Sequence, residues 1–183
     1  MLAFYLSLVD SEEDKSKVEQ IYYQYRNLMF YVARDVLRDE KLAEDAVHQA
    51  FIRIINHLDG VEEIVSHKTR CFVVIVVRNI ARTMYDKRKR ELGFVEAEEA
   101  QGHEFADRKN VEAEVITQMT VDDIKQQIEK LPRIYRDVMV MRYFYEKDER
   151  EISHLLGISY AATRKRLQRA RELVGHKRKR KGV

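Results

Sequence analysis

The sequence predicts an all-α protein with two small helical domains joined by an acidic, flexible linker, the second domain carrying a helix-turn-helix. Apolar residues recur three or four positions apart over most of the 183 residues, a spacing that puts them on one side of a helix. The single proline and all six glycines fall between these periodic stretches, so they are expected to mark the ends of helices.

Three amphipathic helices are expected in the first half of the chain. The first has an apolar stripe over residues 18–36, and Ser11 followed by Asp14 is the pattern of a capped helix start. The second and third have stripes over residues 42–58 and 73–84.

The start of the third helix carries conflicting signals. Residues 72–77 are rich in β-branched side chains, which favour a strand. The helical spacing nevertheless continues to Met84, and no neighbouring segment could pair with a strand, so we predict a helix. The run Cys71–Val77 is also the longest apolar stretch, and its seven residues are far fewer than the roughly 20 that cross a bilayer.

Helical periodicity stops after Arg90. Residues 91–117 carry eight acidic and two basic residues and no apolar face, so we predict a linker over residues 91–119. Apolar spacing resumes near Thr120, and Pro132 is expected to be the first residue of another helix. The expected domains are residues 10–90 and 120–175, followed by a basic tail over residues 176–183.

Residues 149–173 have the pattern of a helix-turn-helix. A short apolar face within residues 152–156 is followed by Gly157, which tolerates the positive φ that ends a helix abruptly. Ser159 is then placed to cap a second helix.

The outer side of this second helix is basic. Residues 163–183 carry ten basic residues and one acidic residue, although the whole chain has a net charge of only +3, and such a segment favours a polyanion such as nucleic acid. An ordinary helical hairpin with a solvated basic face is the alternative, but the turn pattern favours DNA. The DNA contacts expected from this surface are Ser159, Tyr160, Ala161, Arg164, Lys165, Gln168 and Arg169.

The third helix has a second basic stripe opposite its apolar side. Cations spaced along a helix follow phosphates, and an aromatic ring among them can stack on an unpaired base. The alternative is a solvated amphipathic face without a ligand. The nucleic-acid contacts expected here are Arg78, Asn79, Arg82, Tyr85 and Lys89.

The second helix carries an isoleucine, Ile52, on its otherwise polar outer side. An exposed apolar side chain beside charged ones indicates a protein interface, although a single exposed isoleucine is also common on protein surfaces. The residues expected at this interface are Asp45, His48, Gln49, Ile52 and Arg53.

The sequence contains no pattern of a catalytic, cofactor or metal site. Its six histidines lack paired ligand spacing, the lone cysteine cannot build a zinc site, and no glycine-rich phosphate loop occurs. One cysteine also excludes an internal disulfide and fits a reducing compartment. We therefore expect a cytoplasmic protein that is not an enzyme, with no cofactor, no metal and no small-molecule substrate.

Several segments resemble the extracytoplasmic-function (ECF) sigma factors of the sigma-70 family. Residues 131–173 (LPRIYRDVMVMRYFYEKDEREISHLLGISYAATRKRLQRAREL) are similar to region 4, which in that family binds the minus-thirty-five element of promoters. Residues 37–55 (LRDEKLAEDAVHQAFIRII) are similar to region 2.2, which docks on the clamp helices of the RNA polymerase core. Residues 68–90 (KTRCFVVIVVRNIARTMYDKRKR) resemble regions 2.3 and 2.4, which melt and read the minus-ten element.

The resemblance implies a bacterial transcription initiation factor that binds promoter DNA and RNA polymerase core enzyme, often with an anti-sigma factor as a further partner. It implies no cofactor and no enzymatic activity. The sequence departs from the family's usual residues at Phe72, Thr83, Asp86, Thr163 and the pair His48–Gln49.

Two other functions are compatible with the residues alone. One is a helix-turn-helix transcriptional regulator without sigma activity, and the other is a helical adaptor protein. The basic stripe on the third helix argues against both, because neither function needs a second nucleic-acid surface.

Overall fold

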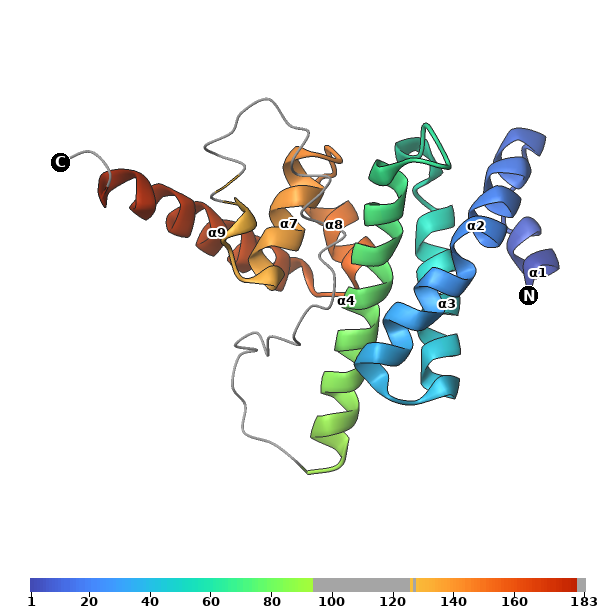
Figure 1. Cartoon of the computed structure of the whole chain (residues 1–183), viewed down its shortest axis with the longest axis horizontal. Helices are drawn as coiled ribbons and strands as arrows, with labels where there is room; N and C mark the ends of the chain where they lie inside the picture. Colours follow the sequence, from blue (N-terminus) through green and yellow to red (C-terminus); the bar gives the residue numbers. More distant parts are fainter. Residues whose placement is uncertain (94–125, 127, 181–183) are drawn as a thin grey trace. The chain divides into compact units, whose positions relative to one another are not determined.

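The computed structural model describes residues 1–93, 126 and 128–180, and every element within these residues is helical. The elements are α1 (Leu2–Leu6), α2 (Glu12–Leu37), α3 (Glu40–Ile55), the 3₁₀ helix η1 (Leu58–Gly60), α4 (His67–Glu91), α7 (Arg133–Tyr143), α8 (Glu149–Leu156) and α9 (Tyr160–Arg180) (Figure 1). The predicted all-α class is confirmed for this part of the chain.

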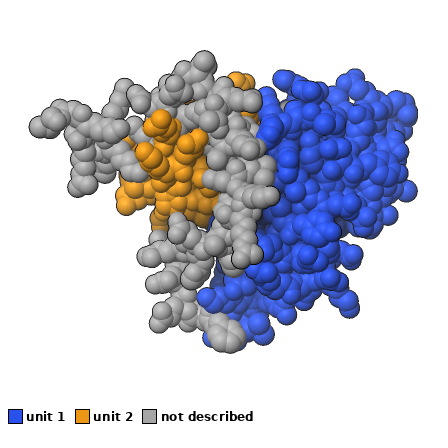
Figure 2. Space-filling view, in the orientation of Figure 1, with its two compact units in different colours: residues 1–95, 155–157 blue, residues 96–154, 158–183 orange. Residues whose placement is uncertain are grey.

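The chain divides into two compact units, residues 1–95 with 155–157 and residues 96–154 with 158–183 (Figure 2). In the first unit, α2, α3 and α4 pack against one another, and α1 lies against α2 and α3. In the second unit, α7 packs against α9.

The core of the first unit is built from apolar residues at helical spacing. Fully burying one aliphatic side chain stabilises a fold by about 1.5–3 kcal/mol. The core side chains that are at most 1% exposed include Val18, Ile21 and Met29 of α2, Ala46, Ala50 and Ile54 of α3, and Val73, Val77 and Ile80 of α4.

The β-branched run at the start of α4 is helical, as predicted. All residues from Cys71 to Ala81 are buried, so this part of the helix has no solvent-facing side. The helix propensity of valine and isoleucine is lower than that of alanine by less than about 0.7 kcal/mol per residue. The gain from burial exceeds this cost, and the segment remains helical.

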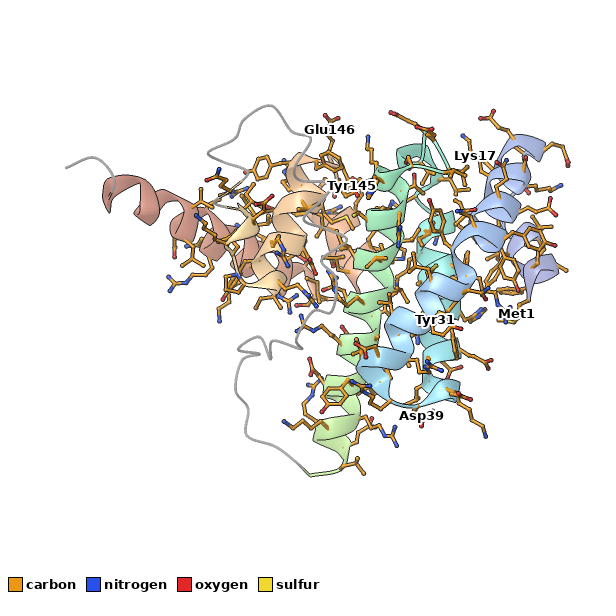
Figure 3. All side chains as sticks on the ribbon, viewed as in Figure 1. Met1, Lys17, Tyr31, Asp39, Tyr145 and Glu146 are labelled. Carbon is orange, nitrogen blue, oxygen red and sulfur yellow. The ribbon has the colours of Figure 1, made fainter. Side chains whose placement is uncertain are left out.

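Each long helix of the first unit begins at a side-chain cap. The cap oxygen accepts a hydrogen bond from the backbone amide three residues further on, which satisfies one of the four amides that a helix start leaves without a partner. The pairs are Ser11 with Asp14, Asp39 with Leu42, and Ser66 with Thr69. The first of these confirms the predicted start of α2, and Asp39 lies in the short turn between α2 and α3 (Figure 3).

A buried tyrosine holds the segment that leads into α4. The hydroxyl of Tyr25 donates to the carbonyl of Ile64 at 2.6 Å, and the hydroxyl of Thr69 donates to the carbonyl of Glu63 at 2.6 Å. Burial raises the pKa of Tyr25, which therefore stays a neutral donor. These two bonds fix the chain between η1 and α4.

In the second unit, Pro132 precedes α7 instead of starting it. Its φ of −52° and ψ of 141° are extended, so the predicted helix start was wrong by one residue. Since the proline nitrogen carries no hydrogen, no amide is left without a partner there.

The turn between α7 and α8 contains polar contacts that sequence reasoning missed. Glu146, which is labelled in Figure 3, has a φ of 55°. The next amide, of Lys147, donates to the carbonyl of Met141 at 3.0 Å. Asp148 accepts from the amide of Glu151 at 2.8 Å, and the Glu151 carboxylate accepts from the amide of Asp148 at 2.7 Å. This reciprocal pair is a capping box that begins α8.

Several sequence predictions fall partly outside the described residues. The helix expected from Thr120 is described only at Gln126 and from Ile128 onward. Glu91, expected in the linker, is the last residue of α4, and the expected linker beyond Gly93 lies outside the described residues. Residues 176–180 of the expected basic tail continue α9 as helix.

Candidate nucleic-acid and polymerase interfaces

The turn between α8 and α9 has the predicted geometry. Gly157 has a φ of +68°, the left-handed conformation that glycine adopts without strain. The amide of Ile158 donates to the carbonyl of Ser153 at 3.2 Å, and Ser153 Oγ donates to the carbonyl of Ile158 at 2.8 Å. Ser159 Oγ accepts from the amide of Ala162 at 3.1 Å and caps α9. A short helix, a tight turn and a capped second helix make a helix-turn-helix.

The inner side of α9 is buried, as predicted. Thr163, Leu167 and Ala170 are 0%, 1% and 0% exposed. The hydroxyl of Thr163 donates to the carbonyl of Ser159 at 3.2 Å, so this polar group is satisfied although it is buried. The apolar face predicted on α8 is buried as well, at Ile152, Leu155 and Leu156.

Burial of the inner side turns the residues predicted to contact DNA toward solvent. All seven are exposed, namely Ser159, Tyr160, Ala161, Arg164, Lys165, Gln168 and Arg169. Long polar side chains on the outer face of such a helix can reach base edges in a major groove. Their exposure is confirmed, and their contacts with DNA stay a prediction.

A carboxylate contacts this surface near the start of α9. Glu149 Oε2 accepts a hydrogen bond from the hydroxyl of Tyr160 at 3.0 Å and lies 3.8 Å from Nε of Arg164. The Arg164 guanidinium lies 6.0 Å from the centroid of the Tyr160 ring, within cation–π range. Sequence reasoning missed these contacts because Glu149 and Tyr160 lie 11 positions apart and are brought together only by the turn.

A second carboxylate contacts the same surface further along α9. Glu172 Oε1 accepts from Nε2 of Gln168 at 3.2 Å, and Glu172 Oε2 accepts from Arg169 at 3.0 Å. The sequence did contain the signal, since residues three and four positions apart on a helix are neighbours.

The basic stripe predicted on α4 is only partly exposed. Arg78 and Asn79 are 7% and 4% exposed, so the prediction that they face solvent is wrong. Asn79 Nδ2 donates to the carbonyl of Ile75 at 2.9 Å within its own helix. Periodicity assigned α4 one buried side, whereas its whole circumference is buried at this level.

The side chains in the C-terminal part of α4 are more exposed to solvent than Arg78 and Asn79. Arg82 is half-buried, while Tyr85, which is 37% exposed, and Lys89 are accessible to solvent. Arg88 lies 3.4 Å from Oδ2 of Asp39, which ties the end of α4 to the start of α3. The cations and the aromatic ring expected to meet nucleic acid are therefore accessible mainly beyond Ala81.

The surface predicted for a protein partner on α3 is less exposed than expected. Asp45 is exposed, whereas His48, Gln49, Ile52 and Arg53 are half-buried. Gln49 Nε2 lies 3.7 Å from the sulfur of Met84, and burial lowers the pKa of the Arg53 guanidinium.

The short helix α1 contacts one edge of this surface. Tyr5 is 1% exposed, its ring stacks on Phe51 with 5.0 Å between centroids, and its hydroxyl lies 2.9 Å from Nδ1 of His48. The Phe4 ring lies 5.5 Å from the His48 ring. Sequence reasoning missed α1, because five residues are too few to show a helical period.

Neither a metal-binding cluster nor a membrane-spanning helix occurs in the part of the chain that the structure describes. No group of three His, Cys, Asp or Glu side chains there could hold a metal ion. No helix there is both long and apolar enough to cross a membrane.

Two segments of the chain match known protein families. Sigma-70 region 2 matches residues 21–91, which contain α2 from Ile21 onward and the whole of α3 and α4. Sigma-70 region 4 matches residues 122–174, which contain the helix-turn-helix. The chain belongs to the sigma-70 family. Sigma factors of this family are transcription initiation factors rather than enzymes.

The relatives of this sigma factor include two ECF sigma factors of Bacillus subtilis (strain 168). The ECF RNA polymerase sigma factor SigM is 25% identical over 156 residues, which cover 85% of this chain and 91% of SigM. The ECF RNA polymerase sigma factor SigW is 27% identical over 158 residues, which cover 82% of each chain. The predicted resemblance is confirmed, and the protein is an RNA polymerase sigma factor of the ECF kind.

A solved structure of the sigma factor RpoE in complex with the anti-sigma factor NepR from Bartonella quintana is more distantly similar to this sigma factor. It shares 15% sequence identity with a TM-score of 0.36, covering 86% of this chain and 94% of that chain.

Proposed function

We propose that this sigma factor directs core RNA polymerase to specific promoters and opens them, with a separate surface for each task. Residues 10–90 form the domain that binds the core enzyme and the minus-ten element, and residues 120–175 form the domain that binds the minus-thirty-five element. Residues 91–119 join the two domains, and residues 176–183 are a basic tail.

The observation that carries the minus-thirty-five assignment is the orientation of α9. Its buried side, centred on Leu167, leaves Lys165 and Gln168 on the exposed side with Arg164 and Arg169 beside them. Lysine can donate to guanine and glutamine can pair with adenine in two directions, while arginines at the flanks suit phosphates.

Fewer residues of α4 are proposed to contact the minus-ten element than the sequence predicted. Tyr85 and Lys89 are exposed and Arg82 is half-buried, which supports stacking on an unpaired base between phosphate contacts. Arg78 and Asn79 are buried. Their burial favours a structural role within α4 rather than direct contact with bases.

The clamp helices of the core enzyme are the proposed partner of α3. The contacting residues are Asp45, His48, Gln49, Ile52 and Arg53. Asp45 supplies an exposed negative charge, and the half-buried Ile52 supplies apolar area beside it. Charge of this kind steers association, and apolar area adds affinity.

Membership of the ECF class also bears on the activity, location and partners of the chain. The chain has no catalytic activity and no cofactor of its own. It acts in the cytoplasm, where RNA polymerase meets DNA. An anti-sigma factor is a third partner, because many ECF factors have one.

The proposal is tested by transcription with purified core enzyme over a genomic library, with sequencing of the transcript starts. Start sites that share upstream elements support it. If the protein binds duplex DNA but adds no promoter-dependent transcripts, it is a regulator without sigma activity.

A pair of charge reversals tests the polymerase surface. Asp45→Lys on α3 should weaken capture of core enzyme and reduce transcription, while the free protein stays folded. Glu19→Lys, at an exposed position on α2, is the matched control and should leave capture unchanged. Equal capture of core enzyme by the two variants would show that α3 is not part of the interface.

A further inference from the structure

The outer side of α9 contains a carboxylate, Glu172, that has no role in the proposed function. Glu172 is the single acidic residue among the ten basic residues of the segment 163–183, and it lies on the side that would face DNA. A carboxylate there repels phosphates, so its presence needs a physical reason other than affinity for DNA.

The contacts of Glu172 supply that reason. One carboxylate oxygen accepts from Nε2 of Gln168 at 3.2 Å, and the other accepts from Arg169 at 3.0 Å. Arg169 thereby holds the carboxylate in place, and the carboxylate holds the amide of Gln168. The three side chains form one connected group on the outer side of α9, where Gln168 and Arg169 are exposed and Glu172 is half-buried.

A glutamine amide can present either its oxygen or its nitrogen to a partner, because rotation by half a turn exchanges the two. A carboxylate only accepts hydrogen bonds, so it selects the orientation in which Nε2 of Gln168 points toward Glu172. The second N–H of that nitrogen and the oxygen Oε1 stay available. They are the donor and the acceptor that adenine requires at N7 and N6.

We propose that Glu172 is a specificity-determining positioning residue, which orients the amide of Gln168 so that it reads one base pair of the minus-thirty-five element. The inference rests on the proposed function, in which Gln168 contacts a base edge. Without the carboxylate, the amide of Gln168 rotates freely. It can then pair with a base edge that presents its donor and acceptor in either order.

The test uses holoenzyme reconstituted from the full chain and core polymerase, with selection and sequencing from duplexes randomised across the minus-thirty-five element. Glu172→Gln keeps the size of the side chain, but its own amide can donate as well as accept, so it no longer fixes Gln168. Glu172→Asp keeps the negative charge, but its shorter side chain does not reach the amide of Gln168. Both variants should lower the preference at one base pair, by up to roughly tenfold.

The matched control is Glu149→Gln. Glu149 is also a carboxylate on this surface, but it contacts Tyr160 and Arg164 instead of Gln168. Its removal should leave the preference at the base pair read by Gln168 unchanged. A loss of preference there in the Glu149 variant as large as in Glu172→Gln overturns the proposal, because a general charge effect then explains both.

Gln168→Ala separates the inference from the function on which it rests. If Gln168→Ala alters the preference at one base pair while Glu172→Gln and Glu172→Asp do not, Gln168 reads DNA and the inference about Glu172 is wrong. If Gln168→Ala alters nothing, the placement of α9 on DNA is wrong as well. The expected result is that Glu172→Gln has no further effect on the preference once Gln168 is alanine.

Discussion

The hydroxyl of Tyr5 lies 2.9 Å from Nδ1 of His48, and this hydrogen bond joins α1 to α3. Tyr5→Phe removes the hydroxyl and keeps the ring that stacks on Phe51. The free energy of unfolding should fall by about 0.5–1.5 kcal/mol, the usual net value of one hydrogen bond. Urea denaturation followed by circular dichroism measures it. Tyr23→Phe, at a ring that is 69% exposed, is the control and should change nothing.

The same tyrosine makes stability depend on pH in the alkaline range. Burial raises the pKa of Tyr5 to about 12, above the value of about 10 for a free tyrosine. A raised pKa in the folded state gives stability that is complete below about pH 10 and is lost as the pH rises toward 12. The stability difference between the parent and Tyr5→Phe should therefore shrink over that range. A difference that stays constant would show that Tyr5 titrates normally.

Asp39 should make stability depend on pH in the acid range, with the opposite sign. The hydrogen bond from the amide of Leu42 and the neighbouring Arg88 guanidinium hold the pKa of Asp39 below its usual value. A lowered pKa gives stability that is present above the ordinary aspartate pKa of about 3.9 and is lost as the pH falls through the folded value.

Substitution by asparagine or by alanine separates the two roles of Asp39, which are to cap α3 and to titrate in the acid range. Asp39→Asn keeps a cap acceptor but cannot titrate, so the melting temperatures of the parent and this variant should converge as the pH falls. Asp39→Ala loses the cap and should melt lower at neutral pH. A difference in melting temperature between the parent and Asp39→Asn that stays constant at every acid pH would contradict the lowered pKa of Asp39.

Gly157 should tolerate asparagine better than alanine. Its φ of +68° is a conformation that costs an L-residue roughly 1–2 kcal/mol, and asparagine is one of the few side chains that visit it routinely. We expect Gly157→Ala to lower both stability and affinity for promoter duplex, and Gly157→Asn to lower them less. Urea denaturation and a duplex titration measure the two effects. Equal stability of Gly157→Ala and the parent would mean that the turn relaxes at no cost.

Gln168 and Arg164 should affect DNA binding in different ways. Gln168→Ala should reduce discrimination at one base pair by about 1–3 kcal/mol, because the bidentate contact is lost. Arg164→Ala should weaken binding to all duplexes alike and lower the salt slope by about one, since it removes a phosphate contact. Titrations against matched and mismatched duplexes at two salt concentrations distinguish the two effects. Loss of sequence preference in Arg164→Ala, with preference kept in Gln168→Ala, would mean that α9 is rotated on the DNA.

Features set by neighbouring residues could be predicted from the sequence alone. The helix start at Ser11, the positive φ at Gly157 and the cap at Ser159 each depend on residues a few positions away. The exposed side of α9 followed as well, because a helical period leaves one outer face once Thr163 and Leu167 are assigned to the inner face.

Features that depend on distant contacts were decided by the tertiary structure. His48 meets Tyr5 across 43 positions, so a residue placed on a free surface is hydrogen-bonded and half-buried. Arg78 and Asn79 lie on the polar side of a helical period, yet α4 is buried around its whole circumference there. Periodicity reports how residues are distributed around one helix. It contains no information on how many sides of that helix are covered, and the packing of the folded chain alone sets that number.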